Sequence, residues 1–343
     1  MANKIKIGVL GAGTWGIALA RMLWNSGHNI TVWSAIEAEI DTLSTTNKHP
    51  NMPEVILPCE IEYTKDIKFA CEEKDLILFA VPSPFVRTTA KKAAPYINES
   101  QIIVDVAKGI EEDTLYTMTD IIAEEINNPS VKIVALSGPT HAEEVVKDLP
   151  TTIVSASKDI KSAEYVQNIF NTRCMRVYTN DDILGVELCG ATKNIIALAC
   201  GIAVGLGCGD NARAAIITRG IAEISRLGAA MGCREQTFGG LAGIGDLIVT
   251  ATSMHSRNFR CGILLGKGVP VDEATHQIGM VVEGLNALPA AIKLAKKYNV
   301  QMPIIEAVNA IVSGGVDVSN VIQLLMSRDL KSEISIVSFD ERN

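Results

Sequence analysis

The sequence predicts an α/β fold with a doubly wound, mainly parallel sheet in its N-terminal part and an all-helical domain after it. Short β-branched runs alternate with helical patterns through the first half of the chain, which is the rhythm of a parallel sheet. From about Asp181 onward, apolar residues recur at helical spacing. At 343 residues the chain exceeds the size at which one core usually stops growing, so two domains are expected.

Seven segments have the composition of strands. In chain order they read KIKIGVL, NITVW, DLILFAV, QIIVDVA, VKIVALS, TTIVSAS and MRVYT. Near-continuous apolar strands, such as residues 76–81, suit a sheet that helices cover on both faces. Strands of this type stop near Tyr178. Beyond them, NARAAIITRGIAEISRLGAAMG and LPAAIKLAKKYN have helical spacing, so the second domain is expected to be all-helical.

Composition and charge exclude several classes of protein. The formal net charge is −8, which argues against a nucleic-acid partner because phosphate binding needs a concentrated basic face. The eight cysteines form no C-x-x-C pair and no cluster with zinc-ligand spacing, so free thiols, no metal site and a reducing cytoplasm are expected. The N-terminus lacks the pattern of a secretory signal. The longest uncharged apolar run, residues 195–208, is too short to cross a bilayer, so no membrane span is expected.

A glycine motif follows the first strand. Gly11, Gly13 and Gly16 form a G-x-G-x-x-G pattern between a predicted strand at residues 5–10 and a predicted helix at residues 17–25. In such a motif the first glycine permits a tight turn, the second lets the backbone approach a pyrophosphate, and the third lets the helix pack on the strand. An ordinary strand-to-helix turn is the alternative. The context favours a dinucleotide cofactor held at a helix N-terminus.

The end of the second strand bears on which dinucleotide is used. Ser34, Ala35 and Ile36 offer neither an acidic side chain for the ribose hydroxyls nor an arginine for a 2′-phosphate. Glu37 is close enough in sequence to reach a ribose, but an exposed glutamate on the following helix is the simpler interpretation.

Two further motifs follow strands of the predicted sheet. Lys108 comes directly after QIIVDVA, at the carboxyl end of a strand, where ligands bind in open α/β sheets. Its alternative is a solvated surface lysine. Gly138 and Thr140 lie in SGPTHA, which follows VKIVALS and offers backbone amides and a hydroxyl at the same edge. Its alternative is a plain Gly-Pro turn.

In the helical half, a lysine directly precedes a long apolar segment that is expected to be buried. Lys193 and Asn194 precede the long apolar run. An unpaired buried ammonium is costly, and desolvation lowers its pKa toward neutrality, which makes a lysine a useful acid or base. The alternative is a lysine at a helix end whose ammonium reaches solvent.

A last group lies in GIGDLIVT and SRN. Arg257 offers a planar fork for a phosphate, and Ser256 is expected to start a helix whose N–H groups assist. Asn258 completes this triplet. Asp246, with Thr250 after it, could hold a lysine ammonium or a substrate hydroxyl; a helix cap or a surface acid is the alternative.

Eight motifs together carry a family resemblance. They are GAGTWG, AKGIE, SGPTHAEE, GATKN, GDNARAAIITRG, GGLAGIGDLIVT, SRN and VVEG. In this order and spacing, from about residue 5 to 330, they resemble the NAD(P)-dependent glycerol-3-phosphate dehydrogenases of the bacterial type. The resemblance implies a Rossmann domain joined to a helical domain of the 6-phosphogluconate-dehydrogenase-like kind. It also implies a cytoplasmic homodimer that reduces dihydroxyacetone phosphate to sn-glycerol 3-phosphate with NADH or NADPH for phospholipid synthesis.

The resemblance also implies roles for individual residues. Lys193 matches the catalytic lysine of the family. The substrate contacts of the family correspond to Lys108, Gly138, Thr140, Asp246, Ser256, Arg257 and Asn258. The cofactor contacts of the family correspond to Thr14, Trp15, Lys108, Ala142, Arg257, Val281 and Glu283. To these the motifs add Asn194 and Thr250 for the substrate and Gly11, Gly13 and Gly16 for the cofactor. The chain departs from many bacterial members at Ala35, where they carry Arg or His.

We therefore expect a dinucleotide-binding Rossmann domain at residues 1–189, a helical substrate and catalytic domain at 190–335 and a C-terminal tail at 336–343. Another two-domain Rossmann dehydrogenase, of the 3-hydroxyacid or 6-phosphogluconate type, is the nearest rival, because fold does not fix substrate. The combination of SRN with Lys193 and Asn194 disfavours it. A non-catalytic dinucleotide sensor is a rival of another class, which the lysine pair and Asp246 disfavour.

Overall fold

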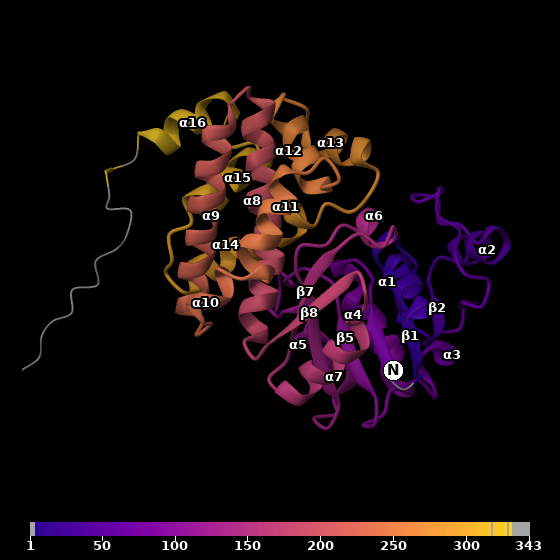
Figure 1. Cartoon of the computed structure of the whole chain (residues 1–343). Coiled ribbons are helices and arrows are strands. Elements are labelled where there is room, and N and C mark those ends of the chain that lie inside the picture. Colours follow the sequence, from indigo (N-terminus) through magenta and orange to yellow (C-terminus); the bar gives the residue numbers. More distant parts are fainter. Residues whose placement is uncertain (1–3, 317, 328, 331–343) are drawn as a thin grey trace, which may run out of the picture.

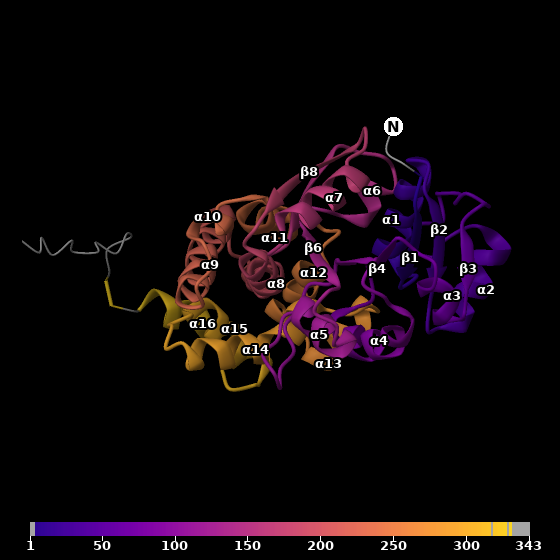
Figure 2. The same cartoon turned by 90° about the horizontal axis from the view of Figure 1, so that it is seen from below.

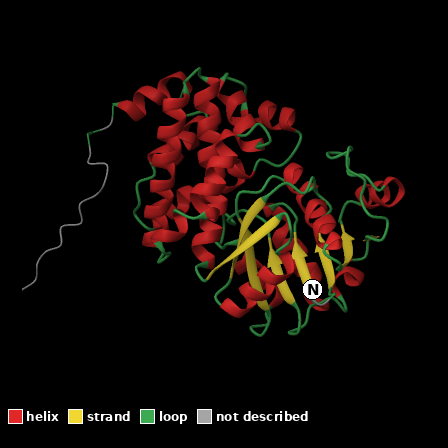
Figure 3. Ribbon diagram, in the orientation of Figure 1, coloured by secondary structure: helices red, strands yellow, loops and turns green. Residues whose placement is uncertain are grey.

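The computed structural model describes residues 4–316, 318–327 and 329–330 (Figure 1). A twisted sheet with helices on both faces forms one lobe, and a group of helices forms the other (Figure 3). The α/β-plus-helical architecture that the sequence predicts is confirmed. The expected end of the helical domain at residue 335 and the tail at 336–343 lie outside the described residues.

Within the described residues, eight strands form one sheet, in the order β3-β2-β1-β4-β5-β6-β7-β8. The strands are β1 (Lys6–Leu10), β2 (Asn29–Trp33), β3 (Glu62–Thr64), β4 (Leu76–Phe79), β5 (Ile102–Asp105), β6 (Lys132–Ser137), β7 (Thr151–Ala156) and β8 (Met175–Asn180). Neighbours are parallel except β6 and β7, which pair antiparallel. The seven expected strands are therefore confirmed, and β3 is an addition at the edge.

Helices cover both faces of the sheet because its side chains alternate between two apolar layers (Figure 2). In β4, Leu76 and Leu78 belong to one layer, while Ile77 and Phe79 belong to the other. The first layer is closed by α1 (Thr14–Asn25), α6 (Ala142–Val145) and α7 (Ile160–Phe170). The second is closed by α3 (Ile67–Cys71), α4 (Val86–Ala93) and α5 (Met118–Ile126). The strands' carboxyl ends are thus left for ligands.

The remaining elements complete both lobes. Helix α2 (Glu37–Thr46) lies at the edge of the sheet lobe beyond β2 and contributes Ile40 and Leu43 to the first layer. The 3₁₀ turns η1 (Ser83–Phe85) and η2 (Ala94–Tyr96) flank α4. The helical lobe consists of α8 (Ile183–Gly205), α9 (Asp210–Ala230), α10 (Glu235–Phe238), η3 (Leu241–Gly245), α11 (Asp246–Thr252), α12 (Arg257–Gly266), α13 (Val271–Ile278), α14 (Glu283–Lys297), α15 (Pro303–Val312) and α16 (Val318–Met326).

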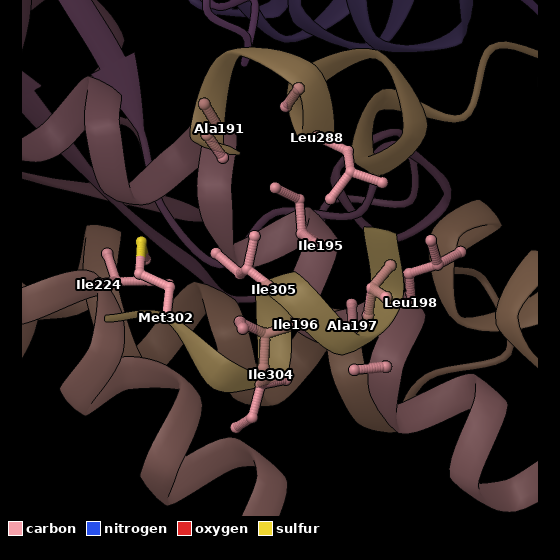
Figure 4. Close-up of a cluster of buried hydrophobic side chains, with 14 of the residues drawn as sticks. Ala191, Ile195, Ile196, Ala197, Leu198, Ile224, Leu288, Met302, Ile304 and Ile305 are labelled. Carbon is pink, nitrogen blue, oxygen red and sulfur yellow. The ribbon is translucent and has the colours of Figure 1, made fainter. Parts of the chain in front are cut away.

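Helix α8 is the centre of the helical lobe. Its side chains meet those of α9, α14 and α15 in one buried apolar cluster, in which Ile195 and Ile196 lie beside Ile305 (Figure 4). By length and composition alone α8 could cross a membrane, but 89% of its most apolar stretch is buried inside the protein. That burial is the pattern of a core helix. The eight cysteines, all within the described residues, are free thiols, as expected.

Helices α8 and α12 cross at unusually close range. A Cβ atom placed at Gly201 of α8 would collide with the carbonyl oxygen of Phe259, and one at Gly262 of α12 would collide with that of Leu198. Gly205 and Gly266 repeat this relationship one turn along. The four glycines let the two backbones touch, which holds α12 against the C-terminal half of α8.

The expected boundary between residues 189 and 190 falls inside α8. The sheet ends at Asn180, and α8 begins at Ile183, where the carboxylate of Asp182 caps it by accepting a hydrogen bond from the amide of Gly185. The first turns of α8 therefore continue directly from the sheet. The exact division between two folding units stays a prediction.

Candidate active site

The glycine turn joins β1 to α1 in the geometry that a pyrophosphate needs. Gly11 adopts φ +123°, and a Cβ atom there would collide with the backbone of Ala80. Nothing lies within 4 Å of where a Cβ would sit on Gly13, so a ligand can approach its backbone. Gly13 precedes the first turn of α1, whose amides no side chain caps. Free N–H groups and the positive end of the helix dipole therefore face an open space, which fits a dinucleotide.

An acidic side chain lies at the end of β2, contrary to the expectation from the sequence. The Ser34 hydroxyl donates a 2.5 Å hydrogen bond to the carboxylate of Glu39, which reaches back from the first turn of α2. Glu37 instead lies on the exposed side of α2, where it forms an ion pair with Lys65. An acidic group thus stands beside the strand terminus, supplied by a residue that the sequence pattern did not single out.

Two lysines from different lobes share one carboxylate where the lobes meet. Lys193 of α8 places its Nζ 2.8 Å from Oδ1 of Asp246, and Lys108, after β5, places its Nζ 2.7 Å from Oδ2. Asp246 is the first residue of α11 and is 1% exposed, so it is neither a surface acid nor a side-chain cap. Lys193 is 3% exposed and sits in the middle of the helix, so it does not reach solvent.

The electrostatics of this triad suit proton transfer. Burial lowers the pKa of Lys193 to about 8; Asp246 opposes that shift and Lys108 adds to it. Burial alone would raise the pKa of Asp246, but the two ammonium groups outweigh burial and hold it below its usual value. Asp246 therefore stays ionised between two cations, while Lys193 can gain or lose a proton near neutral pH.

Hydrogen bonds fix the two ammonium groups. Lys193 donates to the hydroxyl of Thr250 at 2.6 Å, and that hydroxyl donates to the carbonyl of Asp246 one turn earlier in α11. Lys108 donates to the carbonyl of Gly138 at 3.3 Å, which also accepts from the hydroxyl of Thr140. The motifs after β5 and β6 thus meet α8 and α11 at one point.

A polar chain runs from α8 through α12 to α14 beside the lysines. Asn258 donates to the side-chain oxygen of Asn194 at 3.0 Å and accepts from the amide of Gly284 at 2.8 Å. Ser256 caps α12 through a hydrogen bond from the amide of Phe259, as the sequence predicted. These hydrogen bonds hold the start of α12 against the middle of α8.

Arg257 is the first residue of α12. No ion pair among the described residues involves it. A guanidinium beside a helix N-terminus is a site that suits a phosphate group.

The residues expected to contact the cofactor lie on several elements. Thr14 and Trp15 start α1, and Ala142 starts α6, which packs on the same face of the sheet. Glu283 starts α14 and accepts hydrogen bonds from the amide and hydroxyl of Ser83, after β4. Val281 lines a groove that residues 84–85, 275, 280–282 and 285–286 form between the lobes. Ser83 was missed because it belongs to no recognised motif. Gly284 closes the VVEG motif, but its contact with Asn258 is made by the backbone amide, which the residue type does not reveal.

The turn directly before Asp246, which the sequence did not predict, determines how that residue enters the site. The turn η3 is a single π-helical turn with a non-helical residue at Gly243, and it ends directly at Asp246. A Cβ atom at Gly243 would collide with the carbonyl of Phe238, so only glycine fits that approach. Turns of this kind recur at functional sites because they redirect the next side chain.

Comparison with known proteins identifies the family. The profile of the NAD-dependent glycerol-3-phosphate dehydrogenase N-terminus matches residues 6–163, and that of its C-terminus matches residues 182–323. A glycerol-3-phosphate dehydrogenase [NAD(P)+] of Lactobacillus delbrueckii is 61% identical over 96% of this chain and 99% of its own length. That of Bacillus subtilis is 46% identical over 96% of each chain.

Solved structures agree with these sequence relationships. The crystal structure of glycerol-3-phosphate dehydrogenase from Coxiella burnetii aligns with a TM-score of 0.90 and 36% identity, over 95% of this chain and 99% of that one. A ketopantoate reductase from Ralstonia eutropha, at 15% identity and a TM-score of 0.62, shares the fold alone. The chain belongs to the NAD-dependent glycerol-3-phosphate dehydrogenase family.

Proposed function

We propose that this chain reduces dihydroxyacetone phosphate to sn-glycerol 3-phosphate with NADH or NADPH, and that Lys193 is its proton donor. The observation that carries the proposal is the triad in which Lys193 and Lys108 share the buried carboxylate of Asp246. A ketone reduction needs an acid that holds a proton near neutral pH, and burial brings the pKa of Lys193 to about 8.

When bound, a reduced nicotinamide would supply a hydride for the ketone carbon. The Lys193 ammonium then gives its proton to the carbonyl oxygen as negative charge develops there. Asp246 and the Thr250 hydroxyl hold Lys193 in place. Lys108 favours release of the proton because a second positive charge nearby disfavours the charged form of Lys193.

The phosphate of the substrate would bind at a separate position from the ketone. Arg257, at the start of α12, would bind it with the free N–H groups of that helix. Asn258 and Asn194, held together at 3.0 Å, orient this end of the site relative to Lys193. Binding energy at the phosphate then serves to orient the ketone at the reacting end.

Ser256, Gly138 and Thr140 complete the proposed substrate site. The cofactor would lie along Gly11, Gly13, Gly16, Thr14, Trp15, Ala142, Val281 and Glu283, with Lys108 and Arg257 reaching it from the substrate side. The open approach to Gly13 and the uncapped start of α1 support this placement.

A spectrophotometric assay tests the proposal. The purified chain should oxidise NADH or NADPH when dihydroxyacetone phosphate is added, and far more slowly with unphosphorylated dihydroxyacetone or with a 3-oxoacid. Turnover of the 3-oxoacid instead would favour the rival dehydrogenase, and cofactor binding without turnover of any of them would favour a sensor.

The cellular setting is also a proposal. We infer a cytoplasmic homodimer that supplies glycerol 3-phosphate for phospholipid synthesis, as the resemblance implies. The free cysteines suit a reducing compartment, and the net charge of −8 does not suit a nucleic-acid partner.

A further inference from the structure

We propose that Glu39, held by Ser34, binds the adenosine ribose of the cofactor and disfavours a 2′-phosphate, so that the chain prefers NADH to NADPH. In Rossmann folds a carboxylate at the end of the second strand accepts hydrogen bonds from the ribose hydroxyls, whereas a cation there accommodates the 2′-phosphate. In this chain the carboxylate comes from the following helix rather than from the strand itself.

The Ser34 contact fixes where the carboxylate stands. Ser34 is 5% exposed and directly follows β2. Its hydroxyl accepts from the amide of Ile36 at 3.1 Å and donates to Oε2 of Glu39 at 2.5 Å. Glu39 lies in the first turn of α2 and is partly buried, so its side chain points back to the strand terminus with lone pairs left for a ligand.

The strand terminus is tied to the glycine turn. The carbonyl of Trp33, one residue before Ser34, accepts a 2.8 Å hydrogen bond from the amide of Gly11. The buried ring of His49 gives a second link, because it is within electrostatic range of Glu39 and bonds the backbone of Ala12. These contacts tie the strand terminus that holds Glu39 to the glycine turn where the pyrophosphate would bind.

The charges around this turn disfavour a 2′-phosphate. Glu37, Glu39 and Asp41 bring three carboxylates to the start of α2. Lys65 forms ion pairs with Glu37 at 3.2 Å and with Asp41 at 2.9 Å. Its ammonium is therefore matched by Glu37 and Asp41, on the side of α2 that faces Lys65, and the Glu39 carboxylate beside Ser34 is the charge that a 2′-phosphate would meet. Specificity of this kind rests on repulsion as much as on attraction.

A structural role for the pair needs to be separated from a binding role. The Ser34–Glu39 hydrogen bond also ties the start of α2 to the strand. Glu39→Gln keeps an oxygen that can accept from Ser34 but removes the charge. Glu37→Gln makes the same charge change two residues away, on the side of the helix that faces Lys65, and is the matched control.

The test is a fluorescence titration of NADH and of NADPH into the purified chain. No substrate is present, so the result does not depend on whether the proposed substrate site is correct. Wild type should bind NADH at least about tenfold more tightly than NADPH, a difference of about 1.4 kcal/mol. Glu39→Gln should shrink that ratio at least about tenfold, and Glu37→Gln should change it less than about twofold.

Competition by 5′-AMP and by adenosine 2′,5′-bisphosphate repeats the comparison at the ribose end alone, and Glu39→Gln should improve binding of the bisphosphate only. Ser34→Ala keeps the charge but frees the carboxylate, so it should shrink the NADH preference by less than Glu39→Gln does. A wild-type preference for NADPH, an unchanged ratio in Glu39→Gln, or equal shifts in the Glu39 and Glu37 variants would each overturn the proposal.

Discussion

Lys193 and Asp246 form an ion pair at 2.8 Å in which both side chains are almost completely shielded from solvent. A buried ion pair is seldom retained for stability, because the cost of desolvating two charges rivals their attraction. Here Asp246 also pairs with Lys108, and it directly follows the π-helical turn that contains Gly243. The arrangement keeps a protonated lysine in a dry site while holding its pKa near neutrality.

The pH dependence of turnover should report Lys193. Its pKa is lowered to about 8, so it is protonated below that pH and neutral above it. The kcat for reduction of dihydroxyacetone phosphate should therefore fall as pH rises through about 8, and the kcat for oxidation of glycerol 3-phosphate should rise over the same interval. Steady-state kinetics in both directions from pH 6 to 10 measures this.

Asp246→Asn is the control for that assignment. Removing the carboxylate leaves the positive charge of Lys108 unopposed, so the pKa of Lys193 should fall further and the break in both profiles should move to lower pH. A break that stays in place would assign it to a group other than Lys193.

Arg257→Ala should weaken dihydroxyacetone phosphate far more than unphosphorylated dihydroxyacetone. Only the phosphorylated ketone uses the guanidinium, and loss of one charge-assisted contact costs about 1.5–3 kcal/mol. The ratio of kcat/KM for the two ketones measures this. Equal losses for both would mean that Arg257 is structural or serves the cofactor alone.

Gly262→Ala should destabilise the fold by about 1–3 kcal/mol, because the added methyl would force α12 away from the carbonyl of Leu198. Gly239→Ala is the control, since its nearest neighbour would lie 3.7 Å from the new atom and its φ is −78°. Urea unfolding should show a loss for the first variant and a change within about 0.5 kcal/mol for the second. Equal stabilities would contradict the close helix crossing.

Ala35→Arg should move cofactor use toward NADPH by about 1–3 kcal/mol, the scale of one charge-assisted contact. The arginine would stand beside the position of a 2′-phosphate, next to Ser34. Glu39 would partly neutralise it, so the double variant with Glu39→Gln should shift further than either change alone. Values of kcat/KM for NADH and NADPH decide this, and strict additivity of the two changes would argue that the residues do not share one site.

The sequence predicted those elements whose signal is local. Seven strands and the Ser256 cap follow from composition and spacing, and both are present. Strand β3 was missed because it has three residues, Glu62–Thr64, with no apolar run, and pairs only with β2 at the sheet's edge. Short edge strands gain their conformation from the neighbouring strand rather than from their own residues.

Site geometry was harder to predict than site composition. Lys108 and Asp246 lie 138 positions apart, and only the packing of the lobes brings them to 2.7 Å. Glu39 was overlooked because the position of its carboxylate depends on side-chain direction at the start of α2, not on its place in the chain. Motifs therefore indicated which residues carry the chemistry, and tertiary structure decided how they meet.

The role of Lys193 as proton donor is tested most directly by the turnover of Lys193→Met. Methionine roughly keeps the volume of the side chain and removes the proton donor, so kcat for reduction should fall by at least about 100-fold, while the dissociation constant of NADH, measured by fluorescence, stays close to that of wild type. A correctly folded Lys193→Met protein with near-normal turnover would contradict the central claim.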